Sequence, residues 1–457
     1  MKLAVNDNLL HLDGVSLVDI ADQFGTPTYV YSYQHLQEKI RMAREVFEGL
    51  NYHISFAMKA NNNLYILKIF REMGLGADAV SMGEMLAAQK AGYLPNEIIL
   101  NGNGKTDKEI AYAIQQGIFA INVDSYEEFD RIRQFAQLCP DREIRIFLRL
   151  NPDIDPKTHP YISTGLKKNK FGMEFQVGTL ILQEAVKIPN LKVIGTHFHI
   201  GSQLLDHKPY VEAIRKISDF FRSHRRYSMP FINLGGGWGI DYHKEGEGFP
   251  LEAYRQEVIP LLSKLNKKII LELGRYLVSE SCFLLGKVLG IKSTAHKNFV
   301  ITDMGMNDLI RPTLYQAYHF IEPVENIPAR KMVIADIVGP LCETGDKIAE
   351  NYPLKRVEPG EHLVVYDVGA YGYSMVSNYN LRPHGAEVLV RGGKVFLIRP
   401  RQTYEELFSY YEPAQMHVQA LPSPSLSYED MFNLNRPTQT EDILDDQRKE
   451  DQWISSD

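Results

Sequence analysis

The sequence predicts an α/β protein built as a (β/α)8 TIM-type barrel with a second, all-β domain after it. The chain has 457 residues, which is too long for one ordinary core, so two domains are expected. Between about residue 50 and residue 275, short β-rich runs alternate with longer amphipathic stretches, which is typical of parallel strands joined by right-handed crossovers. About eight such units over roughly 225 residues match a (β/α)8 barrel. A doubly wound open sheet is the alternative, but it usually has fewer strands and a glycine-rich turn after the first one.

Eight runs in this region have the composition of buried strands. In chain order they are YHISFAMK (52–59), LGADAVS (75–81), IILNGN (98–103), FAINVDS (119–125), RIFLRLN (145–151), KVIGTHFH (192–199), FINLGGG (231–237) and KIILELG (268–274). The stretches between them, such as NNLYILKIFREM and SYEEFDRIRQFA, place apolar residues three and four positions apart and therefore predict helices.

The pattern changes after residue 280. Runs such as EHLVVYDVGAY and GAEVLVRGGKVFLIR are joined by Gly and Pro turns without clear helical spacers, which predicts an all-β domain. From about residue 421 the chain is polar, acidic and proline-containing. We therefore divide it into an N-terminal segment that contributes to the β-domain (1–28), the barrel (29–280), the C-terminal β-domain (281–420) and an acidic flexible tail (421–457).

Composition excludes several classes of function. A net charge of -7 argues against nucleic-acid or anionic-membrane binding, because both need basic patches. The first residues lack the apolar run of a signal peptide, and no stretch approaches the roughly 20 apolar residues of a membrane span. The three cysteines, Cys139, Cys282 and Cys342, are too few and too scattered for a disulfide framework or a zinc site. We expect a cytoplasmic protein without a structural metal.

Polar groups follow the predicted strands at the edge where such barrels build active sites. In chain order they are Lys59, Asp78, His199, Ser202, the triglycine Gly235, Gly236 and Gly237, and Glu272 followed by Gly274 and Arg275. Each group also has an alternative explanation without a functional site. The lysine can mark the point where the strand enters solvent, and the histidines can be core or metal-binding residues. The triglycine can be a simple turn, and the Glu/Arg pair can be a local ion pair. Their coincidence on one rim argues for a site.

The chemistry that these groups suit is specific. Glycines let backbone N–H groups approach an anion closely, and a serine adds a hydroxyl donor. A carboxylate at a neighbouring strand end can pair with a cationic ring nitrogen, and an imidazole can stack on a flat ring. A lysine at a low-dielectric site loses its charge easily and becomes a nucleophilic amine. A phosphate, a protonated aromatic nitrogen and an aldehyde for the lysine together describe pyridoxal 5'-phosphate.

Several motifs in order make the sequence resemble the fold-type III pyridoxal-phosphate decarboxylases, and among them most closely those that act on diaminopimelate. The resemblance spans about residues 25 to 410. The motifs are AMKAN, the HPYISTG…KFGM stretch from His159 to Met173, HIGSQ (199–203), NLGGGWGIDY (233–242), LELGRY (271–276), MNDLIRPTLYQAYH (306–319), GPLCETGD (339–346) and GAYGYSMVSNYNLRP (369–383). The fold that it implies, an alanine racemase-like barrel with a C-terminal β-domain, agrees with the pattern of strands and helices.

The resemblance implies a role for each matching residue. Lys59 would form the Schiff base with the cofactor, His199 would stack on its ring, and Glu272 would pair with the ring nitrogen. The remaining cofactor contacts would come from Asp78, Ser202, Gly235, Gly236, Gly237, Gly274, Arg275 and Tyr371. Arg275, Arg311, Tyr315 and Tyr371 would bind the substrate, Glu343 would accept its distal ammonium group, and Cys342 would act as the acid after carbon dioxide leaves. In this family Cys342 and Glu343 would come from the partner subunit, which implies a homodimer with shared active sites.

The substrate follows from the same residues. Ornithine and arginine lack a distal carboxylate, so Arg275, Arg311 and Tyr315 would be left with unpaired buried donors, at a cost of several kcal/mol. Meso-2,6-diaminopimelate has both a distal amine and a distal carboxylate, and its decarboxylation gives L-lysine, in the last step of lysine biosynthesis. The alternatives are an ornithine- or arginine-type decarboxylase of the same fold and a catalytically silent regulatory homologue.

One position departs from the family pattern. The family usually has Glu-Pro-Gly-Arg where this chain has Glu272-Leu273-Gly274-Arg275. Leucine restores a backbone N–H and frees φ. We expect a small change in local rigidity and no change in the roles of the flanking residues.

Overall fold

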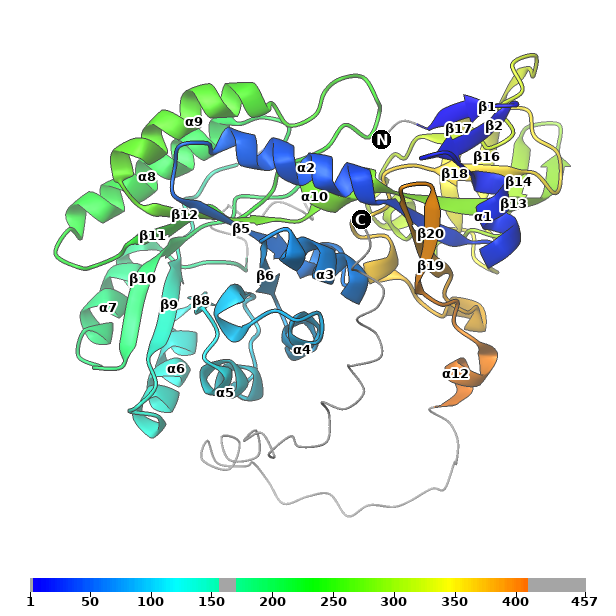
Figure 1. Ribbon diagram of the computed structural model, residues 1–457. Coiled ribbons are helices and arrows are strands. Elements are labelled where there is room, and N and C mark those ends of the chain that lie inside the picture. The colour runs from blue at the N-terminus through cyan, green and yellow to red at the C-terminus, as the bar shows by residue number, and fades with distance from the viewer. Residues whose placement is uncertain (1–2, 156–169, 410–457) are drawn as a thin grey trace.

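The computed structural model describes residues 3–155 and 170–409. They form a barrel surrounded by helices and a β-rich unit beside it (Figure 1). Two predicted features, the acidic tail at 421–457 and most of the His159 to Met173 stretch, lie outside the described residues. Among the residues described, no helix has the length and apolar character needed to cross a membrane.

The predicted barrel is confirmed, because eight parallel strands close on themselves in the order β10-β11-β12-β5-β6-β7-β8-β9. They are β5 (Tyr52–Ala57), β6 (Gly76–Ala79), β7 (Ile98–Leu100), β8 (Ala120–Val123), β9 (Ile144–Arg149), β10 (Leu191–His197), β11 (Phe231–Asn233) and β12 (Lys268–Leu273). Each overlaps one of the eight predicted runs. Leu273 continues β12 and pairs with Phe56 of β5, so the strand extends through the position where the family usually has proline.

Helices follow the strands around the outside of the barrel (Figure 1). They are α2 (Tyr33–Val46), α3 (Leu64–Glu72), α4 (Met82–Lys90), α5 (Asp107–Gln116), α6 (Tyr126–Leu138), α7 (Phe175–Ala185), α8 (Lys208–Ser223), α9 (Leu251–Leu265) and the short α10 (Arg275–Val278). The starts of several are fixed by side-chain caps: the side chains of Asn63, Ser81, Thr106 and Ser125 accept hydrogen bonds from the first turns of α3 to α6. These caps place the strand-to-helix turns, where the polar residues lie.

The second unit is a nine-stranded sheet with a small three-stranded sheet beside it. The larger sheet contains β4 (Thr28–Ser32), β13 (Cys282–Ser293), β14 (Asn298–Thr302), β15 (Ile321–Pro323), β16 (Met332–Val338), β17 (Lys347–Lys355), β18 (His362–Val365), β19 (Ala386–Arg391) and β20 (Lys394–Arg399), and the smaller contains β1 (Ala4–Asn6), β2 (Leu9–Leu12) and β3 (Val15–Ser16). Three short helices belong to this part of the chain: α1 (Leu17–Phe24), α11 (Arg311–Tyr315) and α12 (Tyr404–Phe408).

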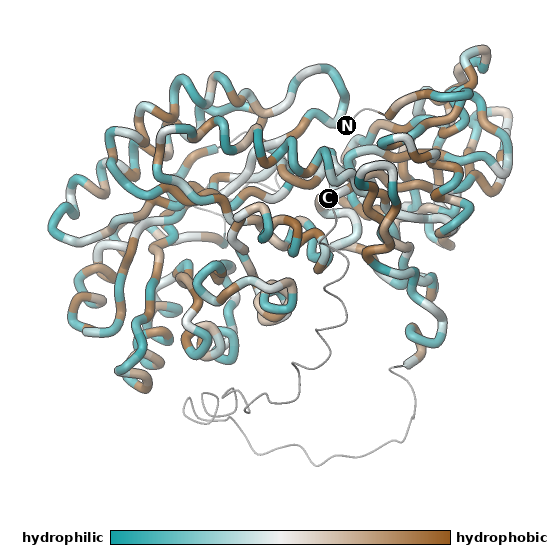
Figure 2. Tube along the Cα trace, in the orientation of Figure 1, coloured by the Kyte–Doolittle hydropathy of each residue, from teal (hydrophilic) through white to brown (hydrophobic). Residues whose placement is uncertain are grey.

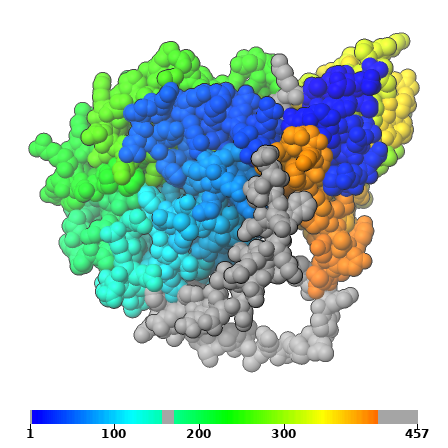
Figure 3. Space-filling model, viewed as in Figure 1, coloured from blue at the N-terminus to red at the C-terminus, as the bar shows by residue number. Residues whose placement is uncertain are grey.

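Strand β4 joins the first and last parts of the chain in one sheet. It pairs with β13 on one side and β19 on the other. The dark blue N-terminal residues and the orange residues of β19 and β20 accordingly lie beside each other in Figure 3. The chain therefore leaves this sheet at Ser32 and enters the barrel at α2.

The two units share a continuous apolar core and a set of polar contacts between them. Buried residues from Tyr29 to Ile398 form one cluster that includes barrel and sheet side chains. The tube in Figure 2 alternates between teal and brown along the outer helices, as expected for helices with one buried face. The backbone N–H of Tyr371 donates to the Ala60 carbonyl at 2.8 Å, and Asn61 Nδ2 donates to the Gly369 carbonyl at 3.0 Å. A loop of the β-domain is thereby held at the end of barrel strand β5.

Candidate active site

A cavity of about 460 Å³ opens at the carboxyl ends of the barrel strands. Its walls include Lys59, Asp78, Asn101, Arg149, His197, His199, Ser202, Gly237, Glu272, Gly274, Arg275, Tyr315 and Tyr371. Lys59 lies in a 3-10 turn (Met58–Ala60) that directly follows β5, and its side chain is exposed to the cavity. Most of the polar residues predicted from the sequence therefore line one space.

Glu272, on β12, is held by four hydrogen bonds. The side-chain amides of Asn101, Asn122 and Asn233 donate to its carboxylate at 2.9, 3.0 and 2.6 Å, and His197 Nε2 donates at 2.9 Å. Burial raises the pKa of this carboxyl, but the contribution of His197 and the other hydrogen bonds outweighs burial and lowers the pKa to about 2. Glu272 is therefore an anion in the barrel at neutral pH.

Asp78 lies on β6, which β5 separates from β12, and its pKa is shifted in the opposite direction. Burial, followed by the negative charge of Glu272, raises its pKa well above the ordinary value. Its Oδ1 atom is buried and has no hydrogen-bond partner among the described residues. The anionic Glu272 and the unused oxygen of Asp78 suit a ligand that presents a protonated nitrogen here, as the pyridine ring of pyridoxal phosphate does.

His199 and the triglycine loop form another wall. Burial, followed by the positive charges of Lys59 and Arg149, lowers the pKa of His199 well below its ordinary value, so the ring is neutral. The Gly236 N–H donates to His199 Nδ1 at 3.2 Å. A Cβ atom on Gly236 would lie 2.0 Å from the Glu272 carbonyl oxygen, so only glycine fits between the loop and β12. Of the three glycines, Gly237 lines the cavity, whereas Gly235 and Gly236 do not.

The end of the cavity near α10 has the donors that an anion needs. Arg275 donates to Ser202 Oγ at 3.1 Å, and its guanidinium lies 4.8 Å from the centre of the Tyr371 ring. Tyr371 adopts a left-handed backbone conformation with φ of 58°. These groups, with Gly237 and Gly274, fit a phosphate.

A smaller cavity of about 260 Å³ shares Arg275 and Tyr315 with the first and adds Arg311. Both arginines are buried, and neither forms an ion pair with a carboxylate of the described residues. Two buried cations without an anion indicate a place where a negatively charged group binds.

Cys342 and Glu343 lie apart from both cavities. Both side chains are exposed, and neither lines the space around Lys59. The Cys342 N–H donates to Asn380 Oδ1 at 3.0 Å, and the Glu343 carboxylate accepts from the Gly345 N–H at 3.2 Å. The chain therefore does not bring these two predicted residues to its own cavity.

The structure adds residues to which sequence reasoning gave no role. The three asparagines around Glu272 lie inside the predicted runs 98–103, 119–125 and 231–237. The sequence does show an asparagine in each of these three predicted strand runs. That pattern indicates a shared hydrogen-bond partner only once the barrel is closed, because closure brings the three side chains to one carboxylate.

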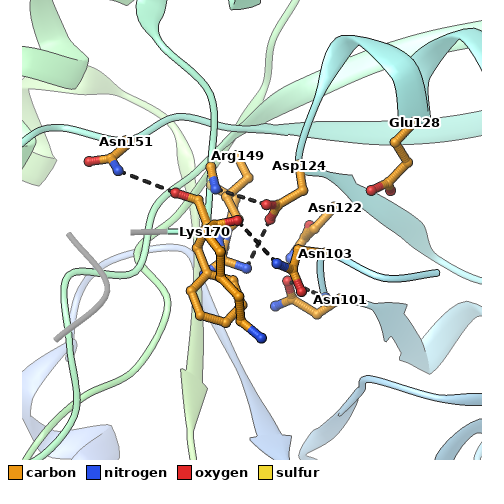
Figure 4. A network of polar contacts seen from close by, with 12 residues as sticks. Asn101, Asn103, Asn122, Asp124, Glu128, Arg149, Asn151 and Lys170 are labelled. Atoms are coloured by element: carbon orange, nitrogen blue, oxygen red, sulfur yellow. Dashed lines mark hydrogen bonds and ion pairs between the residues drawn. The ribbon is translucent and has the colours of Figure 1, made fainter. Parts of the chain in front are cut away.

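Arg149 at the end of β9 also lines the cavity. Figure 4 shows it facing Asp124, with which it forms an ion pair at 3.0 Å. Its guanidinium lies 4.6 Å from the centre of the Phe171 ring, and the Gly172 N–H donates to Asp124 Oδ2 at 2.8 Å. This pair holds the backbone at residues 171–173 against the barrel rim.

Lys105 anchors the loop that carries Asn101. Its ammonium group is buried and donates to the carbonyls of Gly102 and Asn122 at 2.5 and 2.7 Å and to Glu128 at 2.7 Å. All three donors are satisfied, so the charge is compensated. The loop at 101–104, which lines the cavity, is thereby fixed to the end of β8.

Comparisons with known proteins show the family to which the chain belongs. The family model "Pyridoxal-dependent decarboxylase, pyridoxal binding domain" matches residues 33–279. The chain is 43% identical over 405 residues to the diaminopimelate decarboxylase of Aquifex aeolicus (strain VF5), covering 88% of this chain and 96% of that protein. It is 44% identical over 390 residues to that of Neisseria meningitidis serogroup B, covering 85% and 93%.

Solved structures give the same result. The diaminopimelate decarboxylase of M. jannaschii in complex with L-lysine superimposes with a TM-score of 0.85 at 37% identity, covering 90% of this chain and 97% of that one. The Helicobacter pylori enzyme complexed with L-lysine gives 0.82 at 39% identity, covering 86% and 98%. A lysine/ornithine decarboxylase from Vibrio vulnificus, at 19% identity and a TM-score of 0.72, shares the fold.

Proposed function

The chain belongs to the pyridoxal-dependent decarboxylases of fold type III, in their diaminopimelate decarboxylase group, and we propose on that basis that it converts meso-2,6-diaminopimelate to L-lysine and carbon dioxide. The reaction is that of a carboxy-lyase and is the last step of lysine biosynthesis. The observation that carries the proposal is that Lys59, Glu272, His199 and Ser202 line one cavity at the mouth of the barrel. The cytoplasmic location expected from the sequence stays a prediction.

The residues of the cavity fit pyridoxal 5'-phosphate. Lys59 would hold it covalently, Glu272 would keep its ring nitrogen protonated, and His199 would lie against the ring. Ser202, Gly237, Gly274, Arg275 and Tyr371 would hold the phosphate. When bound, the cofactor supplies an electron sink for the electron pair that carbon dioxide leaves behind. Because Glu272 is already anionic and fully hydrogen-bonded, the chain does not have to reorganise to stabilise a charged ring.

The substrate end favours a dicarboxylic diamino acid. Arg275 and Arg311 reach the smaller cavity without a carboxylate partner among the described residues. A second carboxylate on the substrate would pair with them, whereas ornithine or arginine would leave both cations desolvated and unpaired. This is the physical reason to prefer meso-diaminopimelate over the basic amino acids.

A second subunit would complete the site. Cys342 and Glu343 are exposed and lie outside the cavity of their own chain, so in a homodimer they would enter the partner's cavity. There Glu343 would bind the distal ammonium group, and Cys342 would deliver the proton that replaces carbon dioxide. A thiol suits this task because it can be placed where water is excluded.

The substrate assignment is tested by incubating the enzyme with meso-diaminopimelate, ornithine and arginine in parallel and following carbon dioxide release. We expect release only from meso-diaminopimelate, with L-lysine as the product. Lys59→Ala should abolish turnover and the visible absorbance of the bound cofactor, whereas Lys68→Ala, on the exposed face of α3, should change neither. Full turnover in Lys59→Ala would refute the assignment, and a colourless wild-type protein would favour the silent regulatory homologue.

Shared sites are tested by mixing two inactive variants, Lys59→Ala and Cys342→Ala, under conditions where subunits exchange. One of the two kinds of site in a mixed dimer then contains both native residues, so partial activity should return. Lys59→Ala mixed with itself is the control. No recovery in mixed dimers of verified composition would contradict the arrangement.

A further inference from the structure

Arg275 and Arg311 are two buried cations that face the same small cavity. Their relative exposures are 7% and 5%, and the Nε atom of each is buried without a hydrogen-bond partner among the described residues. Like charges repel strongly where little water is present, so something other than an ion pair must hold these side chains in place. Two residues that are not carboxylates, Tyr242 and His319, contact the guanidinium groups and can hold them.

Tyr242 lies between the two guanidinium groups. Arg275 donates a hydrogen bond to its hydroxyl at 2.7 Å, and the Arg311 guanidinium lies 4.7 Å from the centre of its ring. The ring therefore attracts both cations, one through the oxygen and one through the π face. The hydroxyl is also 3.2 Å from Ser279 Oγ, which donates to the Asp367 carbonyl, so the tyrosine is itself fixed.

His319 orients the other side of Arg311. Arg311 lies 2.8 Å from His319 Nε2, and His319 Nδ1 lies 2.7 Å from the Tyr366 carbonyl. A guanidinium can only donate and a carbonyl can only accept, so Nδ1 must carry the proton and Nε2 must be bare. The ring is therefore neutral, which agrees with the lowering of its pKa by burial and then by Arg311.

A tyrosine and a histidine in these positions have a consequence that carboxylates would not have. An aspartate or glutamate at either position would pair with an arginine and compete with an anionic ligand for it. A phenol and a neutral imidazole orient the guanidinium groups and leave their charge available. Both arginines thus remain directed at the cavity that they share with Tyr315.

We propose that Tyr242 and His319 are positioning residues that fix Arg275 and Arg311 and thereby set the preference for a substrate with a distal carboxylate. The inference rests on the proposed function, since it concerns the substrate end of that site. Neither residue lines the cofactor cavity around Lys59. Loss of His319, which contacts Arg311 and not Arg275, should therefore weaken carboxylate recognition without releasing the cofactor.

The test compares two ligands, one with and one without the carboxylate that Arg275 and Arg311 are proposed to bind. L-lysine keeps the carboxylate that the reaction does not remove, whereas cadaverine has none. Binding of each is followed by the change in the visible absorbance of the holoenzyme in wild type, His319→Phe, His319→Gln and Tyr242→Phe. Glutamine keeps an acceptor for Arg311 and a donor for the Tyr366 carbonyl, so it is the matched control for phenylalanine.

We expect His319→Phe and Tyr242→Phe to weaken L-lysine about 10-fold or more, because each removes a hydrogen bond to a charged group. The affinity for cadaverine should change less than about 2-fold. His319→Gln should recover most of the affinity for L-lysine that His319→Phe loses. In the two weakened variants, KM for meso-diaminopimelate should rise more than kcat falls. Equal weakening of both ligands, or no weakening of L-lysine, would overturn the inference. If His319→Phe does not fold, Tyr242→Phe and His319→Gln decide the same question. A wild-type enzyme that neither binds L-lysine nor decarboxylates meso-diaminopimelate would instead refute the proposed function.

Discussion

Replacing Glu272 with glutamine tests the electrostatics of the barrel directly. The carboxylate accepts from four donors, whereas a glutamine amide accepts at one atom and donates at the other. If its oxygen takes the place of Oε1, its NH₂ group faces the donors of Asn101 and His197. The asparagines cannot all rotate to compensate, because Asn101 Oδ1 already accepts from the Gly102 N–H and Asn233 Oδ1 from the Gly235 N–H.

The size of the effect follows from the pKa of the carboxyl. A fall in pKa from the ordinary 4.5 to about 2 means that the surroundings stabilise the charged form over the neutral one by on the order of 3 kcal/mol. A neutral amide should lose about that much unfolding free energy at pH 7. Turnover should fall by about 10²- to 10³-fold, because the ring nitrogen of the cofactor loses its anionic partner.

The assay is urea unfolding of the two proteins at several pH values, together with steady-state kinetics. Because the folded pKa is depressed, the stabilisation by Glu272 is present above pH 4.5 and is lost as the pH falls toward 2. The difference between Glu272→Gln and wild type should thus be constant from pH 5 upward and shrink below pH 4.5. Glu252→Gln, on the exposed start of α9, is the control and should match wild type. A variant as stable and as active as wild type at pH 7 would refute the reasoning.

Three further perturbations test other parts of the structure. Gly236→Ala should lower Tm sharply and reduce the cofactor content, because the new Cβ would lie 2.0 Å from the Glu272 carbonyl oxygen. Lys105→Met should cost about 3 to 5 kcal/mol in urea unfolding, because it leaves Glu128 buried without its cation. Burial raises the pKa of Asp308 to about 7, so its contribution to stability is lost as the pH rises from about 4 to 7. Asp308→Asn should therefore gain stability relative to wild type at pH 8 but not at pH 4.

The first two have matched controls. Gly290→Ala places a Cβ in open space on β13 and should leave Tm unchanged, and Lys108→Met removes an exposed lysine from α5. Controls as damaging as the test variants would contradict the packing and ion-pair arguments. For Asp308→Asn, a pH dependence of unfolding parallel to that of wild type would show that this carboxyl does not titrate as described.

The barrel was predictable because its signal is periodic and local. Each of the eight runs has the composition of a buried strand, and most are followed by a helix with apolar residues on one face. The position of Lys59 at a strand end followed from the same pattern. Strand β4 was harder to assign, because its neighbours β13 and β19 are hundreds of residues away in the sequence and its composition fits either unit.

The surroundings of Glu272 could not be predicted in the same way. Asn101, Asn122 and Asn233 meet only because the register of the closed barrel places the ends of β7, β8 and β11 at one depth. Tyr242 and His319 are 77 residues apart by number and lie in loops, so no spacing rule connects them. Sequence patterns identify which residues lie at the rim, but the partners of those residues depend on tertiary contacts.

The two ends of the site are built differently, and this limits where substrate preference can change. The end around Glu272 is made of barrel strands whose backbones nearly touch, as the contact at Gly236 shows, so a substitution there disturbs the fold. The end around Arg311 is made of loops and the short helix α11, and Arg311 and His319 both lie in the segment between β14 and β15. Substitutions in that segment can alter what the arginines bind while the barrel strands that hold the cofactor stay in place. A change of substrate in this chain should therefore require changes at residues 306–319 before any change around Lys59 or Glu272.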